Sequence, residues 1–175
     1  MKFVVSSNTL LTRLQAVSKV IGGKPVQPIL DNILLVATEG VLYATASDKE
    51  TTMEARIELE SLEEEGKITI SAKILLDILK EFPEQPLTFE INTETNEVKI
   101  ISEKGEFSVP GESAEDYPIQ AALNDSSNDL TSKCGLILEG IVKTIFATAN
   151  DDLRPVMNCI LIEMNEDNFT RSEEH

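Results

Sequence analysis

The residue types that carry most enzyme chemistry are scarce in this sequence. Its only histidine is the last of 175 residues, so no Ser/His or Cys/His pair is expected in an ordered site. General acid-base work would fall to carboxylates or lysines. Cys134 and Cys159 lie in no C-x-x-C motif and no Cys/His cluster, so we expect two reduced, structural thiols. These observations weigh against nucleophilic catalysis.

Two carboxylate pairs and one glycine-rich segment are the remaining chemical candidates. Glu115-Asp116 and Asp151-Asp152 offer the oxygen ligands that Mg²⁺ prefers, but such pairs arise by chance among 31 acidic residues. The segment 22–25, Gly-Gly-Lys-Pro, superficially resembles a phosphate loop, yet it follows a predicted helix and lacks the G-x-x-x-x-G-K-[ST] pattern. We therefore expect no metal, no cofactor and no enzyme activity.

Lys24 in that segment suits a transient contact with a nucleic-acid backbone, and a glycine cap with an incidental lysine is the alternative. The formal net charge of −16 argues against nucleic acid as a partner, but the charges are unevenly spread. Residues 49–66 contain seven acids and two bases, whereas residues 8–24 contain three bases and no acid. This pattern is expected if one face meets a polyanion, and a random solvated face stays open as the alternative.

The elements that must position these residues follow from hydrophobic periodicity. Residues 1 to about 118 read as two β-α-β-β-β units in tandem. The first unit has a strand over Lys2–Ser6 and then a helix, with Asn8 as its N-cap and Gly22-Gly23 at its C-terminal end. Strands over 33–37, 41–44 and 53–59 follow. The second has a strand over 67–70, a helix capped by Ser71 and followed by Pro83, then strands over 87–91, 98–100 and 107–109. We expect an α+β fold, with both helices packed side by side on one face of an antiparallel sheet.

The sequence pattern of the first β-α-β-β-β unit is repeated after a linker of low apolar content at 122–128. An offset of 127 places Pro155–Ile162 on Pro28–Leu35, and Ile137, Leu138 and Ile141 on Leu10, Leu11 and Leu14. We expect a complete domain at 1–121 and the first part of a second domain at 129–175, as in a truncated chain. The last five residues match nothing in the first copy.

No run approaches the roughly 18 to 20 apolar residues of a membrane span. The start, MKFVVSSNTLL, lacks the apolar region and cleavage site of a secretory signal. We expect a soluble, cytoplasmic protein with no membrane contact.

Several motifs together resemble the bacterial DNA sliding clamp family, the beta subunit of DNA polymerase III. The resemblance runs from Met1 to about Thr170 and is carried by MKFVV, LQAVSKVI, GGKPVQPILDNILL, ATASD, SAKILLDILKEFP and AEDYP. Members of that family have three similar domains, each built of two β-α-β-β-β units, and are about twice as long. The resemblance implies the DNA-clamp fold, of which this sequence would supply the first domain and the opening half of the second.

The resemblance also implies a processivity factor without chemistry of its own. In full-length form, such a protein encircles double-stranded DNA as a homodimeric ring. It tethers the DNA polymerase III catalytic subunit, and binds the clamp loader, through a peptide-binding pocket. The alternative is a non-catalytic α+β protein-interaction module of the same fold that does not encircle DNA.

Residue roles carry over only where the motifs match. Lys24 and Lys73 match basic DNA-facing positions, and Asp151 stands where the family places a polar DNA contact. Pro155 and Val156 replace aromatic residues found there in some members.

Two further roles concern protein contacts. Met157 matches an aliphatic residue of the partner-peptide pocket, although the Asp-Gly-His-Arg segment of that pocket is missing and His175 is not its histidine. Ile78 and Phe107 match apolar residues of the subunit interface, with ordinary core or an isolated exposed residue as the alternative.

Overall fold

The computed structural model describes residues 1–22, 27–118, 132–149, 154–164 and 169–172. Its contacts divide the chain into two units, Met1–Ala121 (unit 1) and Ala122–His175 (unit 2), and each is described by itself. The predicted linker at 122–128 lies outside the described residues. None of the described helices is long and apolar enough to cross a membrane.

Unit 1 contains the two predicted β-α-β-β-β halves in the predicted order. The first half comprises β1 (Lys2–Ser6), α1 (Ser7–Val17), β2 (Asn32–Thr38), β3 (Val41–Ser47) and β4 (Thr52–Glu58), with short 3-10 helices η1 (Ser18–Val20) and η2 (Pro28–Asp31). The second half comprises β6 (Gly66–Ser71), α2 (Ala72–Lys80), β7 (Pro86–Asn92), β8 (Glu97–Ser102) and β9 (Gly105–Glu112), followed by η3 (Ala114–Asp116). One strand was not predicted, β5 (Ser61–Glu64), which lies in the acidic stretch between the halves.

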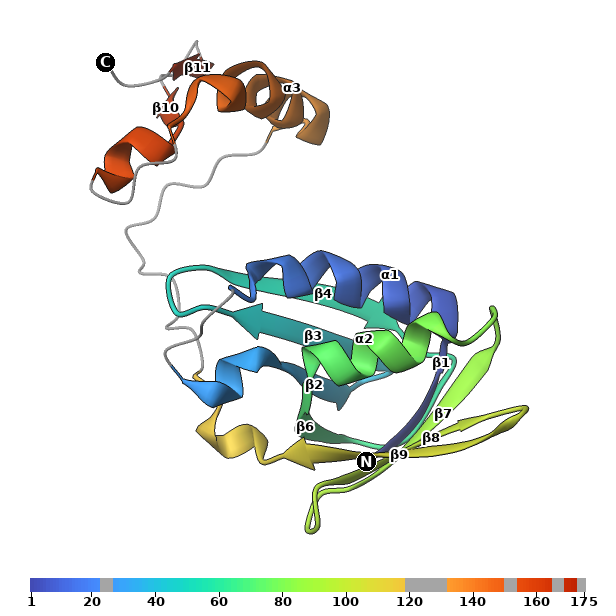
Figure 1. Ribbon diagram of the computed structural model, residues 1–175. Helices are drawn as coiled ribbons and strands as arrows, with labels where there is room; N and C mark the ends of the chain where they lie inside the picture. The colour runs from blue at the N-terminus through green and yellow to red at the C-terminus, as the bar shows by residue number, and fades with distance from the viewer. Residues whose placement is uncertain (23–26, 119–131, 150–153, 165–168, 173–175) are drawn as a thin grey trace. The chain divides into compact units, whose positions relative to one another are not determined.

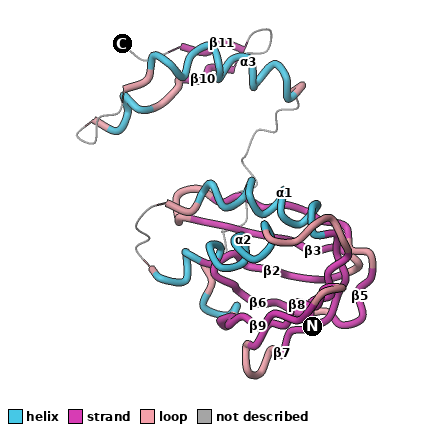
Figure 2. Tube along the Cα trace, turned by 45° about the vertical axis from the view of Figure 1, so that its right-hand side comes forward, coloured by secondary structure: helices cyan, strands magenta, loops and turns pink. Residues whose placement is uncertain are grey.

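All nine strands form one antiparallel sheet in the order β4-β3-β2-β6-β9-β8-β7-β1-β5. The first strand of each half pairs with the other half, since β1 lies beside β7 and β6 lies beside β2. Helices α1 and α2 lie side by side on one face of the sheet, as predicted (Figure 1). Figure 2 shows the same layering from a second direction. We call this the helix face and the opposite side the open face.

The ends of α1 differ from the prediction. Ser6, the last residue of β1, caps the helix by accepting a hydrogen bond from the Thr9 amide at 3.4 Å, so Asn8 is not the cap. The helix also ends at Val17 and not at Gly22-Gly23. The Ser18 hydroxyl donates to the Gln15 carbonyl at 3.2 Å there, and the chain continues as the 3-10 turn η1. Ser71 precedes α2 as predicted, although its side chain makes no capping bond.

The core lies between the sheet and the two helices. Alternate strand residues point to the helix face and are buried, and across the β1–β7 pair Phe3 stacks on Phe89 with ring centroids 5.0 Å apart. The helices contribute fully buried side chains at helical spacing, namely Leu10, Leu14, Leu75 and Leu79. Because each half lends a strand to the other, the two halves of unit 1 share one core.

Unit 2 repeats the elements of the first half at the predicted offset. Helix α3 (Cys134–Thr144), η4 (Ile145–Ala147) and η5 (Pro155–Asn158) lie 127 residues after α1, η1 and η2, with identical lengths. Beyond them, β10 (Leu161–Met164) and β11 (Phe169–Ser172) form an antiparallel pair. The predicted repeat is therefore confirmed in these elements. Cys134 and Cys159 are reduced thiols, as predicted, but both are exposed, so they are not core thiols.

Candidate nucleic-acid interface and protein-contact surfaces

The helix face of unit 1 exposes more basic than acidic side chains. Helices α1, η1 and α2 carry four basic residues, Arg13, Lys19, Lys73 and Lys80, against one acid, Asp77, and all five are exposed. Lys80 pairs with Asp77 at 3.1 Å. Arg13, Lys19 and Lys73 form no ion pair among the described residues, so their charges face solvent.

The strands of unit 1 carry the opposite balance of charge. They hold eight glutamates and four basic residues, Lys2, Arg56, Lys67 and Lys99. Lys2 bonds Glu63 at 3.0 Å and Glu90 at 3.3 Å, and Lys99 bonds Glu106 at 3.3 Å. The hydrogen bonds that the Lys2 ammonium donates to Glu63, and then to Glu90, raise the pKa of Lys2. Much of the positive charge on the strands is therefore already paired with carboxylates.

The predicted DNA-contact residues fall in both units. Lys73 is exposed near the start of α2. Lys24 and Asp151 lie outside the described residues. Pro155 opens η5, where proline fits the first helical position, and Val156 follows with 56% of its surface exposed.

Met157, the predicted peptide-pocket residue, also lies in η5. Its amide donates to the Arg154 carbonyl at 3.0 Å, and its carbonyl accepts from the Ala149 amide at 2.8 Å. Its side chain is half-buried, beside the exposed Val156. This segment thus joins the end of the α3 region to the turn that precedes β10.

Phe107 and Ile78, the predicted subunit-interface residues, lie on β9 and α2 of unit 1. Phe107 on β9 is 44% exposed and meets Phe82 edge-on, with centroids 5.3 Å apart. Ile78 is half-buried and packs against the core one helical turn before Phe82. Ile74, to which the sequence analysis gave no interface role, is 41% exposed and lies one turn before Ile78. The spacing i, i+4, i+8 places Ile74, Ile78 and Phe82 along one side of this segment.

The edge of the sheet beside Phe107 is open. Strand β9 pairs with β8 from Gly105 to Pro110, but with β6 only through Gly111 and Glu112. Within the described residues, the backbone from Gly105 to Pro110 thus has a partner strand on one side only. An open edge beside exposed apolar side chains is a template for adding another strand.

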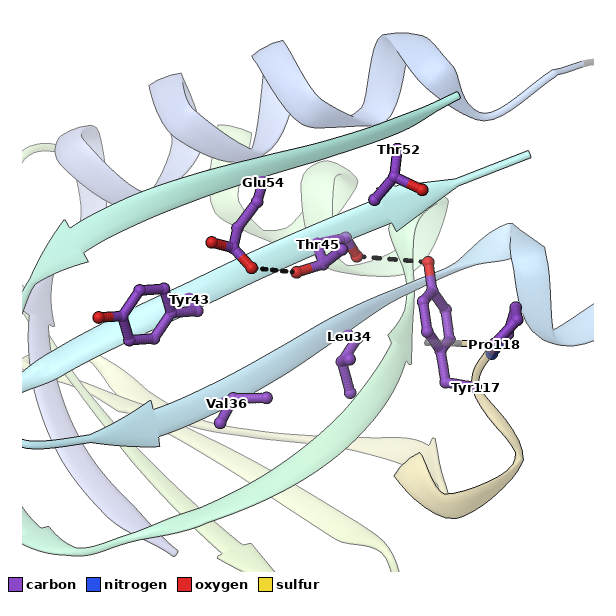
Figure 3. Close-up of a pocket in the computed structure, with 8 residues that line it drawn as sticks. All are labelled: Leu34, Val36, Tyr43, Thr45, Thr52, Glu54, Tyr117 and Pro118. Carbon is purple, nitrogen blue, oxygen red and sulfur yellow. Dashed lines mark hydrogen bonds between the residues drawn. The ribbon is translucent and has the colours of Figure 1, made fainter. Parts of the chain in front are cut away.

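The open face carries a pocket of about 400 Å³ that sequence reasoning missed (Figure 3). Its lining comes from β2, β3, β4 and the turn after η3: Leu34, Val36, Tyr43, Thr45, Thr52, Glu54, Tyr117 and Pro118. Tyr117 closes one end, and its hydroxyl donates toward the carbonyls of Thr45 at 3.4 Å and Asn32 at 3.5 Å. Burial raises the pKa of Tyr117, and a backbone hydrogen bond from Ser47 partly opposes this.

Comparison with known proteins identifies a matching protein family and similar proteins. Residues 1–122 match the family described as DNA polymerase III beta subunit, N-terminal domain. The beta sliding clamp of Vibrio cholerae is 34% identical over 167 residues, which make up 94% of this chain and 44% of that protein. The beta sliding clamp of Proteus mirabilis is 35% identical over 93% of this chain and 44% of its own length.

Solved structures show the same likeness. The DNA polymerase III subunit beta of Pseudomonas aeruginosa superposes with a TM-score of 0.88 at 27% identity, covering 98% of this chain and 46% of that one. A sliding clamp of the same organism, bound to griselimycin, has a TM-score of 0.84 at 30% identity over 94% of this chain and 44% of that one. The chain thus spans less than half the length of these relatives. It belongs to the DNA polymerase III beta subunit family, through a match that covers the N-terminal domain of that family.

Proposed function

We propose that this chain is the N-terminal part of a DNA sliding clamp. In full-length form the protein would encircle duplex DNA as a ring dimer and tether the replicative polymerase. The observation that carries this proposal is the separation of charge in unit 1, where the helices are basic and the strands acidic. A ring lined by such helices attracts DNA into its hole, while the acidic strands repel DNA elsewhere.

Sliding requires weak contacts to phosphate without reading of bases. Lys73 and Lys24 are the proposed phosphate contacts, and the exposed Arg13 of α1 and Lys19 of η1 join them. Asp151, Pro155 and Val156 are the proposed DNA contacts of unit 2. Few basic residues suit this task, because many strong contacts would slow the sliding.

The proposed protein contacts lie on other surfaces. Met157 would contribute to a pocket for peptides of the polymerase catalytic subunit and the clamp loader; the griselimycin complex shows a bound ligand on a relative. Ile78 and Phe107, together with Ile74, would meet the second subunit at the open edge of β9. No catalytic role is proposed for any residue. The second candidate is a non-catalytic protein-interaction module that does not encircle DNA, and the acidic strands with their open edge favour it over an enzyme.

A domain exchange tests the proposal. Residues 1–122 of this chain replace the N-terminal domain of the Vibrio cholerae beta sliding clamp, and the chimera is loaded on nicked circular plasmid DNA. We expect the chimera to stay on circular DNA through gel filtration and to leave when the plasmid is linearised. Lys73→Glu should shorten its residence on circular DNA, since it reverses a charge on the helix face.

Lys67→Glu is the matched control, because Lys67 is also an exposed lysine but lies on strand β6. It should leave the residence time unchanged. A chimera that has the mass of a dimer but leaves circular DNA as fast as linear DNA would contradict the proposal. That result would favour the interaction module.

A further inference from the structure

Unit 2 presents an apolar stripe that runs along α3 into η4. Its side chains follow the spacing i, i+4, i+7, i+8 along one side of the helix, and each is more than half exposed: Leu138, Val142, Ile145 and Phe146. At the last three of these positions, unit 1 carries the polar residues Gln15, Ser18 and Lys19. An exposed apolar stripe of this length indicates a surface that another element covers.

Unit 1 shows what covers the equivalent side of α1. Leu11, the equivalent of Leu138, is half-buried and lines the same pocket as Phe82, which follows α2. The start of α1 also bonds the segment after α2, because the Ser7 hydroxyl donates to the Pro83 carbonyl at 2.8 Å. The two helices therefore run antiparallel, and α2 lies on the side of α1 that corresponds to the stripe.

The two halves of unit 1 are arranged as two copies in a dimer would be. Each half lends its first strand to the other, since β1 pairs with β7 and β6 pairs with β2. An exchange in both directions, together with antiparallel helices, is what a two-fold axis produces, and two-fold dimers are the commonest protein oligomers. Unit 2 has the helices and strands of one such half. Two copies of unit 2 can therefore pair their α3 helices as α1 pairs with α2.

The strands and charges of unit 2 agree with such pairing. Strand β10 corresponds to positions 34–37 of β2, which pair with β3 on one side and β6 on the other. Among the described residues, β10 pairs with β11 alone. The charged residues of α3 and η4 are Glu139 and Lys143, which pair with each other. Two such helices approach without like-charge repulsion, although the chain as a whole has a net charge of −16.

We propose that the 175-residue chain forms a two-fold dimer in which the stripe of α3 and η4 packs against the same stripe of a second copy. This interaction goes beyond the proposed clamp function, because it requires neither DNA nor a ring. In the proposed full-length clamp, the following half of the same chain would take this place. The pairing of copies is therefore a property of the 175-residue chain.

Light scattering after gel filtration tests the proposal on the full 175-residue chain over a series of concentrations. We expect the mass to rise from that of one chain toward twice that value. Leu138→Glu should raise the dissociation constant at least about tenfold, because it places a charge in an apolar interface. Leu136→Glu is the matched control and should leave the constant unchanged. Leu136 belongs to the same helix and is 54% exposed, against 59% for Leu138, but lies about 200° around the helix from it.

Val142→Lys separates this pairing from a general association of acidic chains. It lowers the net negative charge, so it should strengthen a non-specific association. It should also weaken the packing of the two stripes at least about tenfold, and we expect this second effect to dominate. Val142 is 62% exposed within unit 2, so the substitution should leave the chain folded, which circular dichroism verifies. This variant serves as the test if Leu138→Glu fails to fold.

The other outcomes are distinct. A chain that stays monomeric at every concentration would overturn the proposal, and so would equal weakening by Leu138→Glu and Leu136→Glu. A dimer that Val142→Lys strengthens would overturn it as well. If Phe107→Ser abolishes the association and Leu138→Glu does not, the copies meet at the edge of β9 and the proposal is wrong. None of these readouts involves DNA, so failure here is separate from failure of the clamp function.

Discussion

Helices α1 and α3 have the same length, occupy equivalent places in the repeat and differ sharply in burial. In α1, Leu10 and Leu14 are fully buried. In α3 the equivalent residues, Ile137 and Ile141, are only half-buried, and the only buried residue of this helix is Gly140. Helix α1 packs on a nine-stranded sheet and against α2, whereas unit 2 contains one two-stranded sheet among its described residues.

The comparison shows that α3, with two described strands in its unit, is less buried than α1, which packs on a complete sheet. In unit 1, β6 of the second half pairs with β2 of the first half, and β1 of the first half pairs with β7 of the second half. Helix α2 of the second half also packs beside α1. Apolar spacing is thus necessary for a buried helix, but a second half completes the core. The following predictions test that dependence, from the largest expected effect to the smallest.

Leu14→Ala should lower the free energy of unfolding of unit 1 by about 3 kcal/mol, because it empties space in a shared core. Ile141→Ala, at the equivalent position in α3, should leave that value unchanged within about 0.5 kcal/mol. Urea titration followed by tyrosine fluorescence measures this, since both tyrosines, Tyr43 and Tyr117, belong to unit 1. Equal losses in the two variants would show that the units unfold as one.

Gly111→Ala should cost about 2 kcal/mol by crowding the junction of β6 and β9. An added Cβ would lie 2.9 Å from Ile68 Cγ1 and 3.0 Å from the carbonyl oxygens of Asn96 and Thr69. Gly105→Ala in the same strand is the control, because a Cβ there meets nothing within 4 Å. Thermal unfolding of both variants measures the difference, and an unaffected Gly111→Ala would mean that the halves are not tightly joined there.

Ser7→Ala should cost about 1.5 kcal/mol, since it removes a buried link between α1 and the segment after α2. The Ser7 hydroxyl donates to the Pro83 carbonyl at 2.8 Å and accepts from the Gln85 amide at 3.0 Å. Ser18→Ala is the control, because its exposed hydroxyl bonds only within the first half, to Gln15. If the two variants were equally stable in urea, this link would not hold the halves together.

Tyr117→Phe should have the smallest effect at neutral pH, since its hydrogen bonds to the first half are long. Because burial raises the pKa of Tyr117, folding favours its neutral form. That contribution is complete below the ordinary tyrosine pKa of about 10 and is lost as the pH rises through the higher folded value. The wild type should therefore lose more stability than Tyr117→Phe between about pH 9 and 11. Parallel losses in urea titrations would contradict the assignment.

Local patterns were enough to predict the helix that carries Lys73, whereas the DNA-binding role of this residue stays a proposal. Lys73 lies exposed on a helix because Leu75, Ile78 and Leu79 define the buried side of α2. The clamp resemblance assigned roles to Ile78, Phe107 and Met157, and these roles stay proposals. The pocket could not be predicted, because Leu34 and Val36 read as ordinary members of an apolar strand. The lining forms because the strand register places Val36 opposite Tyr43, and because the chain after η3 places Tyr117 against β3.

The sequence by itself determined the elements of unit 1 other than β5, the 127-residue repeat and the separation of charge between helices and strands. These follow from periodicity and composition, which act over a few neighbouring residues. Tertiary structure alone decided that the halves exchange their first strands, that β5 borders β1, and that β9 has an open edge. Such pairings join residues as distant as Lys2 and Glu90, and their register depends on the packing of a core that both halves share.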